Sequence, residues 1–307
     1  MKVAFFVYLT KGAFCSIIVS MMKISVDFGE ILNRYGVTQA VKLVKEAGFE
    51  AVDFPMQEKK GKLFLECEKY LENAKWVRQV LNEHGLTCNQ AHAGWDFHYG
   101  DKMDESGKSF RLLKRAFEFA SVLGAETLVV HAVSDVPPVD FTAYNLAFYK
   151  SLEPFAKQYG VKIGIENIFN FDERYHAFYG VLSTPLAMNA FLQKLKSDVF
   201  VVCADTGHAQ VTGVAPEKFI AGISAGRLQA VHLHDNDGKD DLHLLPYTGA
   251  LDFDKIAAAL RKVGYKGDIT LEIPYFLEKF TNEELPVALK LSAQVAAALR
   301  EKVGGAQ

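Results

Sequence analysis

Short apolar runs alternate along the chain with longer segments in which apolar residues recur every three to four positions. The short runs are rich in β-branched residues and end in polar ones, which is typical of buried strands. We predict eight such strands, at residues 23–27, 50–54, 86–92, 126–131, 161–167, 199–205, 228–234 and 268–273. The longer segments predict helices near residues 37–47, 66–84, 110–123, 141–159, 184–196, 216–224, 253–263 and 283–303.

Three glycines support the helix boundaries. Gly48, Gly85 and Gly124 follow the last periodic residue of the first three helices, where glycine ends a helix by adopting a left-handed conformation. Strands and helices in alternation imply a parallel sheet covered by helices. Eight units favour an α/β fold of the closed (β/α)8 TIM-barrel type, whose usual size is roughly 250 residues. An open doubly wound sheet is the alternative, but no Gly-x-Gly-x-x-Gly turn follows the first strand.

Composition narrows the class of protein further. The 307 residues contain 34 Lys and Arg against 37 Asp and Glu, a balance that excludes a polycationic DNA-coating protein. No Pro-, Gly- or Ser-rich linker divides the chain, so we predict a single domain. The four cysteines form no Cys-x-x-Cys pair, and we expect reduced thiols in a cytoplasmic protein.

The N-terminal residues 1–21 stand apart from this pattern. They are apolar, but Lys11 and Gly12 interrupt them, whereas a membrane-spanning helix needs roughly 20 consecutive apolar residues. We therefore expect no membrane anchor. The sequence from Met22 onward is typical of an opening strand. We predict that residues 1–21 are a non-native or disordered extension and that residues 22–307 form the barrel.

Candidate chemistry gathers where the predicted strands end. Active sites of TIM barrels lie at the carboxyl ends of the strands. Six of the nine histidines lie at these ends or in the loops that follow: His92, His131, His208, His232, His234 and His243. Four carboxylates lie there as well: Glu166, Asp205, Asp241 and Glu272. Each histidine taken alone is more often structural than a ligand, and Asp205 could simply cap the turn that follows it.

Four of these residues could meet at one point. Glu166, Asp205, His232 and Glu272 end four different strands, and their mixed oxygen and nitrogen donors suit one divalent ion such as Mn²⁺, Mg²⁺, Zn²⁺ or Co²⁺. The two glutamates are the strongest candidates, because an unpaired buried carboxylate is costly and has no good structural explanation.

From Met22 onward the chain resembles the xylose isomerase-like TIM-barrel superfamily. This group includes sugar isomerases, 3-epimerases, inosose dehydratases and the family-2 AP endonucleases. The resemblance rests on residues 231–253 and on a set of short motifs. These are Glu166-Asn167, Asp205-x-x-His208, His232-x-x-Asp235, His243-x-x-Pro246 and Glu272.

The resemblance implies roles for these residues. Glu166, Asp205, His232 and Glu272 match the metal ligands of the epimerases, and His208 matches a substrate contact. His92, His131, Asp241 and His243 match the further ligands with which AP endonucleases hold three zinc ions. In the single-metal case we expect the substrate-binding residues to be His92, His131, His208, His243 and Trp95.

One motif separates the two groups. AP endonucleases carry Leu-Gly-Glu-Gly after the last histidine, whereas residues 244–249 read LLPYTG here, and the run 249–253 is similar to the sugar-metabolising members. We therefore expect a divalent-metal-dependent sugar or sugar-phosphate isomerase or epimerase. Glu166 and Glu272 would be the catalytic acid and base, moving a proton α to a carbonyl through an enediolate.

Three alternatives remain. An inosose-type dehydratase would use the same site, an AP endonuclease-like phosphodiesterase would hold three zinc ions, and a non-catalytic domain would bind sugar without turnover. As partners we expect a small sugar or sugar phosphate and a second copy of the chain in a homodimer or homotetramer. We do not expect nucleic acid.

Overall fold

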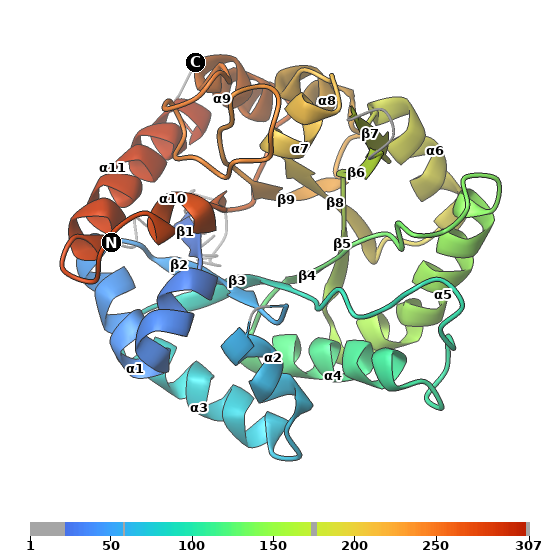
Figure 1. Cartoon of the computed structure of the whole chain (residues 1–307), viewed down its shortest axis with the longest axis horizontal. Coiled ribbons are helices and arrows are strands. Elements are labelled where there is room, and N and C mark those ends of the chain that lie inside the picture. The colour runs from blue at the N-terminus through green and yellow to red at the C-terminus, as the bar shows by residue number, and fades with distance from the viewer. Residues whose placement is uncertain (1–21, 58, 173–176, 305–307) are drawn as a thin grey trace, which may run out of the picture.

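Eight parallel strands form the inner wall of a barrel in the computed structural model, which describes residues 22–57, 59–172 and 177–304 (Figure 1). The predicted extension at residues 1–21 lies outside these ranges. The strands are β1 (Ile24–Asp27), β2 (Ala51–Pro55), β3 (Thr87–His92), β4 (Thr127–Val130), β5 (Lys162–Glu166), β8 (Phe200–Asp205), β9 (Leu228–His232) and β10 (Ile269–Leu271). They pair in the order β10-β1-β2-β3-β4-β5-β8-β9.

The barrel closes between β9 and β10. Leu233 donates its backbone N–H to the carbonyl of Thr270 at 2.9 Å, and Glu272 donates to the carbonyl of Leu233 at 3.2 Å. A parallel bridge joins Leu233 to Leu271. The (β/α)8 prediction is therefore confirmed, and the predicted strands agree with the observed ones to within two residues at each end.

Helices ring the strands (Figure 1). They are α1 (Gly29–Ala47), α2 (Lys59–Glu66), α3 (Tyr70–Glu83), α4 (Lys108–Leu123), α5 (Phe141–Tyr159), α6 (Pro185–Leu195), α8 (Pro216–Gly222), α9 (Phe253–Lys262) and α11 (Leu285–Gly304). The helix predicted at 37–47 is the second half of α1, because Gly36 interrupts α1 with φ 70°. The helix predicted at 66–84 corresponds to α3, which begins four residues later, and α2 before it was not predicted. No helix in the part of the chain described is long and apolar enough to cross a membrane.

Besides α2, three short elements were not predicted, and each of them follows a strand at whose end a predicted ligand lies. An antiparallel hairpin of β6 (Ile168–Asp172) and β7 (Ala177–Val181) follows β5. Helix α7 (Thr206–Val211) follows β8, and helix α10 (Pro274–Glu278) follows β10. The chain thus departs from plain strand–helix alternation where it surrounds the candidate site.

Two groups of buried side chains support this arrangement. Side chains such as Ile163 and Ile165 belong to the large core between strands and helices. Val129, Cys203 and Ala230 form a separate small cluster. Alternation along a strand sends neighbouring residues to opposite faces, so this second cluster fills the barrel interior. The ligand-type residues at the ends of β5, β8 and β9 lie above this apolar base.

Candidate metal centre and catalytic pocket

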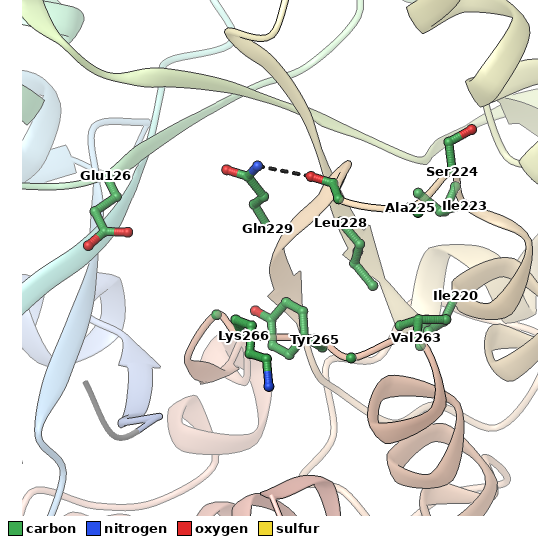
Figure 2. Close-up of a pocket in the computed structure, with 13 residues that line it drawn as sticks. Glu126, Ile220, Ile223, Ser224, Ala225, Leu228, Gln229, Val263, Tyr265 and Lys266 are labelled. Carbon is green, nitrogen blue, oxygen red and sulfur yellow. Dashed lines mark hydrogen bonds between the residues drawn. The ribbon is translucent and has the colours of Figure 1, made fainter. Parts of the chain in front are cut away.

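Eight of the ten predicted site residues, all except Asp205 and His232, line a cavity of about 520 Å³ at the carboxyl ends of the strands. A second cavity of about 310 Å³ lies at the opposite ends, between residues that precede β4 and β10 and residues beside α8 and α9 (Figure 2). Its lining includes Glu126, Gln229, Tyr265 and Lys266 and contains no histidine among the residues described. The candidate chemistry therefore belongs to the larger cavity.

The structure brings the four predicted metal ligands together. Glu166, Asp205 and His232 are the last residues of β5, β8 and β9, and Glu272 directly follows β10. One donor atom of each lies within 4.8 Å of the others. Nδ1 of His232 is 3.1 Å from Oε1 of Glu166 and 3.4 Å from Oε2 of Glu272. All four residues are buried.

A second cluster shares Glu166. Nε2 of His131 lies 2.7 Å from Oε2 of Glu166, and Nε2 of His92 lies 3.6 Å from the same oxygen. The two ring nitrogens of His92 and His131 are 3.0 Å apart. Glu166 thus faces His232 with one carboxylate oxygen and this histidine pair with the other.

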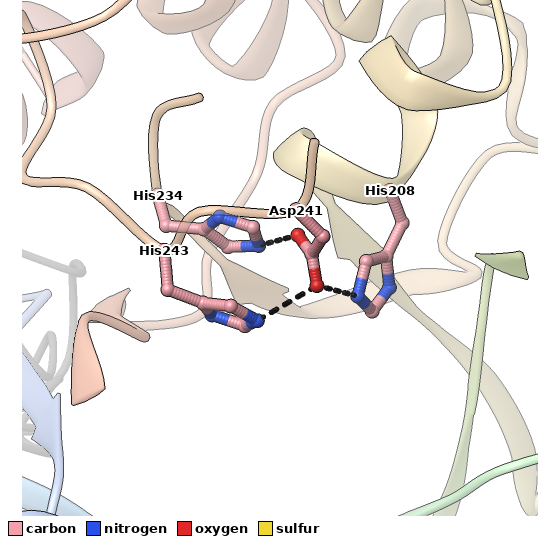
Figure 3. A group of neighbouring side chains, drawn as sticks. All are labelled: His208, His234, Asp241 and His243. Carbon is pink, nitrogen blue, oxygen red and sulfur yellow. Dashed lines mark hydrogen bonds and ion pairs between the residues drawn. The ribbon is translucent and has the colours of Figure 1, made fainter. Parts of the chain in front are cut away.

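A third cluster contains His208, His234, Asp241 and His243 (Figure 3). Oδ2 of Asp241 is 2.9 Å from Nε2 of His243 and 3.5 Å from Nε2 of His208. The His234 and His243 rings stack with centroids 4.0 Å apart. His243 has φ 42°, a left-handed backbone conformation that is rare outside glycine.

Hydrogen bonds fix which ring nitrogens can bind a metal. The Nδ1 atoms of His92, His208 and His243 face the carbonyls of Ala93, Asn167 and Glu272 at 3.0, 3.1 and 3.0 Å. A carbonyl only accepts, so each Nδ1 carries a proton, and Nε2 is the nitrogen of each ring that could bind a metal. Oε2 of Glu272 is buried and accepts no hydrogen bond. These histidine nitrogens and carboxylate oxygens are suitable ligands for a divalent ion.

Burial and neighbouring charges separate the two glutamates. Burial raises the pKa of Glu272 above its usual value. Burial would also raise the pKa of Glu166, but His232 and His131 outweigh it and hold the pKa well below the usual range. Burial lowers the pKa of His131 to about 4. For His243 burial acts in the same direction, but the hydrogen bond to Asp241 outweighs it and raises the pKa to about 9.

Asp205 also caps a helix, as its alternative interpretation predicts. Its Oδ1 accepts the backbone N–H of His208 at 2.7 Å at the start of α7. Its carboxylate is also 2.9 Å from Nε2 of His234. A Cβ atom on Gly207 would lie 2.0 Å from Cε1 of His234. The glycine of the Asp-Thr-Gly-His segment therefore leaves room for the His234 ring.

Aromatic rings border the cavity mouth. Trp95 is 59% exposed and stacks on His131. Tyr275 lies edge-on to His243 with ring centroids 4.9 Å apart. Trp95, which the sequence predicts to contact substrate, thus lines the cavity.

Sequence reasoning missed Asp53. Its Oδ2 lies 3.0 Å from Nε2 of His232 and accepts a hydrogen bond from Nε2 of Gln90 at 2.8 Å. The available signal was an acidic residue inside the otherwise apolar strand β2, Ala51–Pro55. A charged side chain in such a strand points to a buried partner.

Comparison with known proteins places the fold and these motifs in one family. Residues 41–294 match the family described as xylose isomerase-like TIM barrel. An uncharacterized protein of Sinorhizobium fredii is 26% identical over 300 residues, covering 86% of this chain and 91% of its own. A ketose 3-epimerase of Arthrobacter globiformis is 25% identical, covering 77% of each chain. The crystal structure of a D-tagatose 3-epimerase-like protein superposes with a TM-score of 0.67 at 24% identity, covering 92% of this chain and 100% of its own. The chain belongs to the xylose isomerase-like TIM barrel family.

Proposed function

We propose that this protein is a divalent-metal-dependent sugar isomerase or epimerase that moves a proton α to a carbonyl. One observation carries the proposal: Glu166 and Glu272 approach the same nitrogen of His232, at 3.1 and 3.4 Å, from two strands. Two carboxylates around one point can divide the roles of acid and base. The similarity to a ketose 3-epimerase over 77% of each chain supports the same class of reaction.

The site residues have separate roles in metal binding, proton transfer and substrate binding under this proposal. Glu166, Asp205, His232 and Glu272 would hold the ion, which when bound supplies a Lewis acid that polarises the sugar carbonyl. One glutamate removes the proton α to the carbonyl, and the other returns a proton to the opposite face or to the adjacent carbon. His208, 6% exposed at the cavity wall, orients a substrate hydroxyl through Nε2. Trp95 covers an apolar face of the sugar.

The cavity favours a sugar without phosphate. Its described lining contains no lysine or arginine and includes Asp27, Asp135 and Asp241. Phosphate recognition relies on Arg, Lys or converging backbone N–H groups, and acidic neighbours oppose it. An uncharged ketose suits this electrostatic environment.

Proton transfer provides the test. The metal-loaded protein is incubated with ketohexoses in D₂O, and ¹H NMR follows loss of the signal at the carbon next to the carbonyl. We expect deuterium incorporation together with an epimeric or isomeric sugar. Epimerases and dehydratases begin with the same proton abstraction, so exchange alone does not separate them. A product that has lost water would identify the dehydratase instead. Sugar binding without exchange would overturn the enzymatic proposal.

The three ligand clusters support a second candidate, a trinuclear zinc phosphodiesterase. The three clusters together contain ten residues that could bind metal, including His208, His234, Asp241 and His243. This candidate predicts three zinc ions per chain by elemental analysis and cleavage of abasic-site DNA. The acidic cavity lining speaks against a DNA substrate, because phosphate contacts dominate DNA affinity. About one ion per chain would exclude the trinuclear centre.

A further inference from the structure

Asp53 connects the candidate metal centre to the far wall of the barrel. It lies on β2, whereas His232 ends β9, and β10 and β1 separate these strands in the sheet order. Its Oδ2 nevertheless lies 3.0 Å from Nε2 of His232. Sheet pairing cannot produce this contact, which must cross the barrel interior below the cavity. Both side chains are buried, with exposures of 1% and 0%.

A second hydrogen bond orients the Asp53 carboxylate. Gln90, at the register position beside Asp53 on β3, donates from Nε2 to Oδ2 of Asp53 at 2.8 Å. The other end of the Gln90 amide accepts a hydrogen bond from Thr270 on β10 at 3.4 Å. Thr270, Gln90, Asp53 and His232 therefore form one buried chain of contacts through the barrel. Oδ1 of Asp53 accepts no hydrogen bond.

The contact between Asp53 and His232 determines which ring nitrogen of His232 carries a proton and which can bind a metal. A carboxylate only accepts hydrogen bonds, so Nε2 of His232 carries a proton in this contact. Nδ1 faces two further carboxylates, Glu166 at 3.1 Å and Glu272 at 3.4 Å, so it also carries a proton while no ion is bound. When an ion binds among these carboxylates, Nδ1 is the nitrogen that gives up its proton, because Nε2 keeps the proton that Asp53 holds. His92, His208 and His243 obtain the equivalent arrangement from backbone carbonyls. At His232 a buried side chain replaces the carbonyl.

We propose that Asp53 is a positioning residue for the metal centre: it holds the Nε2 proton of His232 and so presents Nδ1 as a ligand. A buried carboxylate is costly without such a role. Partners of this kind restrict the ring orientation and increase the basicity of the ligand nitrogen. The inference rests on the metal site of the proposed function and is independent of the identity of the sugar.

The test compares Zn²⁺ binding by the wild type, D53A and D53N. Affinity is read from the ring signals of His232 in ¹H–¹⁵N NMR spectra during competition with a chelator, so that ions bound at other clusters are not counted. We expect D53A to weaken binding at His232 by about 10–100-fold. D53N should lie between the two, because an amide oxygen still accepts the hydrogen bond. The zinc-loaded wild type should show a slowly exchanging Nε2 proton that D53A lacks.

The matched control is D268N. Asp268 is a partly buried aspartate before β10, at the opposite end of the barrel, and it accepts the backbone N–H of Lys23 at 2.7 Å. D268N should keep wild-type affinity, and the unfolding temperatures of all metal-free variants should be compared. If D53A does not fold, the zinc affinity of D53N at His232 is compared with that of the wild type instead. Wild-type affinity in D53A, or in D53N in that case, would overturn the inference and leave the proposed function standing. A wild type that binds none of Zn²⁺, Co²⁺, Mn²⁺ and Mg²⁺ at His232 would overturn both.

Discussion

The indole of Trp95 stacks on the imidazole of His131 with ring centroids 5.5 Å apart and planes 17° from parallel. His131 in turn contacts Glu166 at 2.7 Å, so the aromatic wall and the candidate acid–base residue are two contacts apart. Under the proposed function, this contact would couple the position of a sugar on the indole to the acid–base residues. Trp95 offers a direct way to observe substrate binding.

Replacing Trp95 should affect substrate binding more than turnover. Stacking is worth about 0.5–1.5 kcal/mol, so W95A should raise KM roughly 2–10-fold, and W95F should retain most of the affinity. The chain has two tryptophans, and Trp76 lies on α3 away from the cavity. In W76F, sugar should change the fluorescence of the remaining Trp95. An unchanged KM in W95A would place the sugar elsewhere.

Removing either candidate acid–base group should abolish proton transfer. We expect E166Q and E272Q to reduce deuterium exchange by about 10²–10⁴-fold, because general acid–base catalysis contributes that much. E126Q provides the matched control, since Glu126 lines the cavity at the opposite end of the barrel. A glutamate variant that retains full exchange would remove that residue from the mechanism.

The stability of the metal-free protein should depend on the protonation of His243. Burial opposes the charged ring, but the Asp241 hydrogen bond raises its pKa from 6.5 to about 9. A raised pKa stabilises the folded state below pH 6.5, and this contribution is lost as the pH rises to about 9. The shift sets an upper limit of about 3 kcal/mol at 1.36 kcal/mol per pKa unit. Thermal unfolding of chelator-treated protein at pH 6.5 and 9 checks this, and H243Q should show a smaller difference.

Gly207 and His234 should be energetically coupled. G207A places a methyl group 2.0 Å from Cε1 of His234, so we expect overpacking to cost about 1–3 kcal/mol of unfolding free energy. H234A removes the obstructing ring, and the same glycine change should cost less in that background. Urea unfolding of both single variants and the double variant measures the coupling. Additive costs would show that the ring is not what requires glycine.

The sequence predicts the barrel well because its main signals are local. The strand expected at 161–167 is β5 (Lys162–Glu166), and the helix expected at 141–159 is α5 (Phe141–Tyr159). Buried strands and amphipathic helices of this length record their environment in their own periodicity. Helices α7 and α10 have six and five residues, too few to establish a helical period.

Some residues of the candidate site can be predicted from the sequence, and others cannot. The residues that end strands, such as Glu166 and His232, follow from the fold once the barrel is predicted. The contact between Asp53 and His232 joins residues 179 positions apart across the barrel interior. Its geometry depends on strand order and barrel size together, which no local pattern contains.

The backbone of His243 has one more consequence. Its φ of 42° lies in the left-handed region, which glycine adopts without strain. A residue with a side chain loses about 1–2 kcal/mol of conformational energy there. His243 adopts this conformation with its ring stacked on His234 and its Nε2 2.9 Å from Asp241, so these contacts offset the backbone cost. Replacing His243 by glycine would therefore remove the backbone cost and the ring contacts together, and the change in unfolding free energy would be the difference between the two.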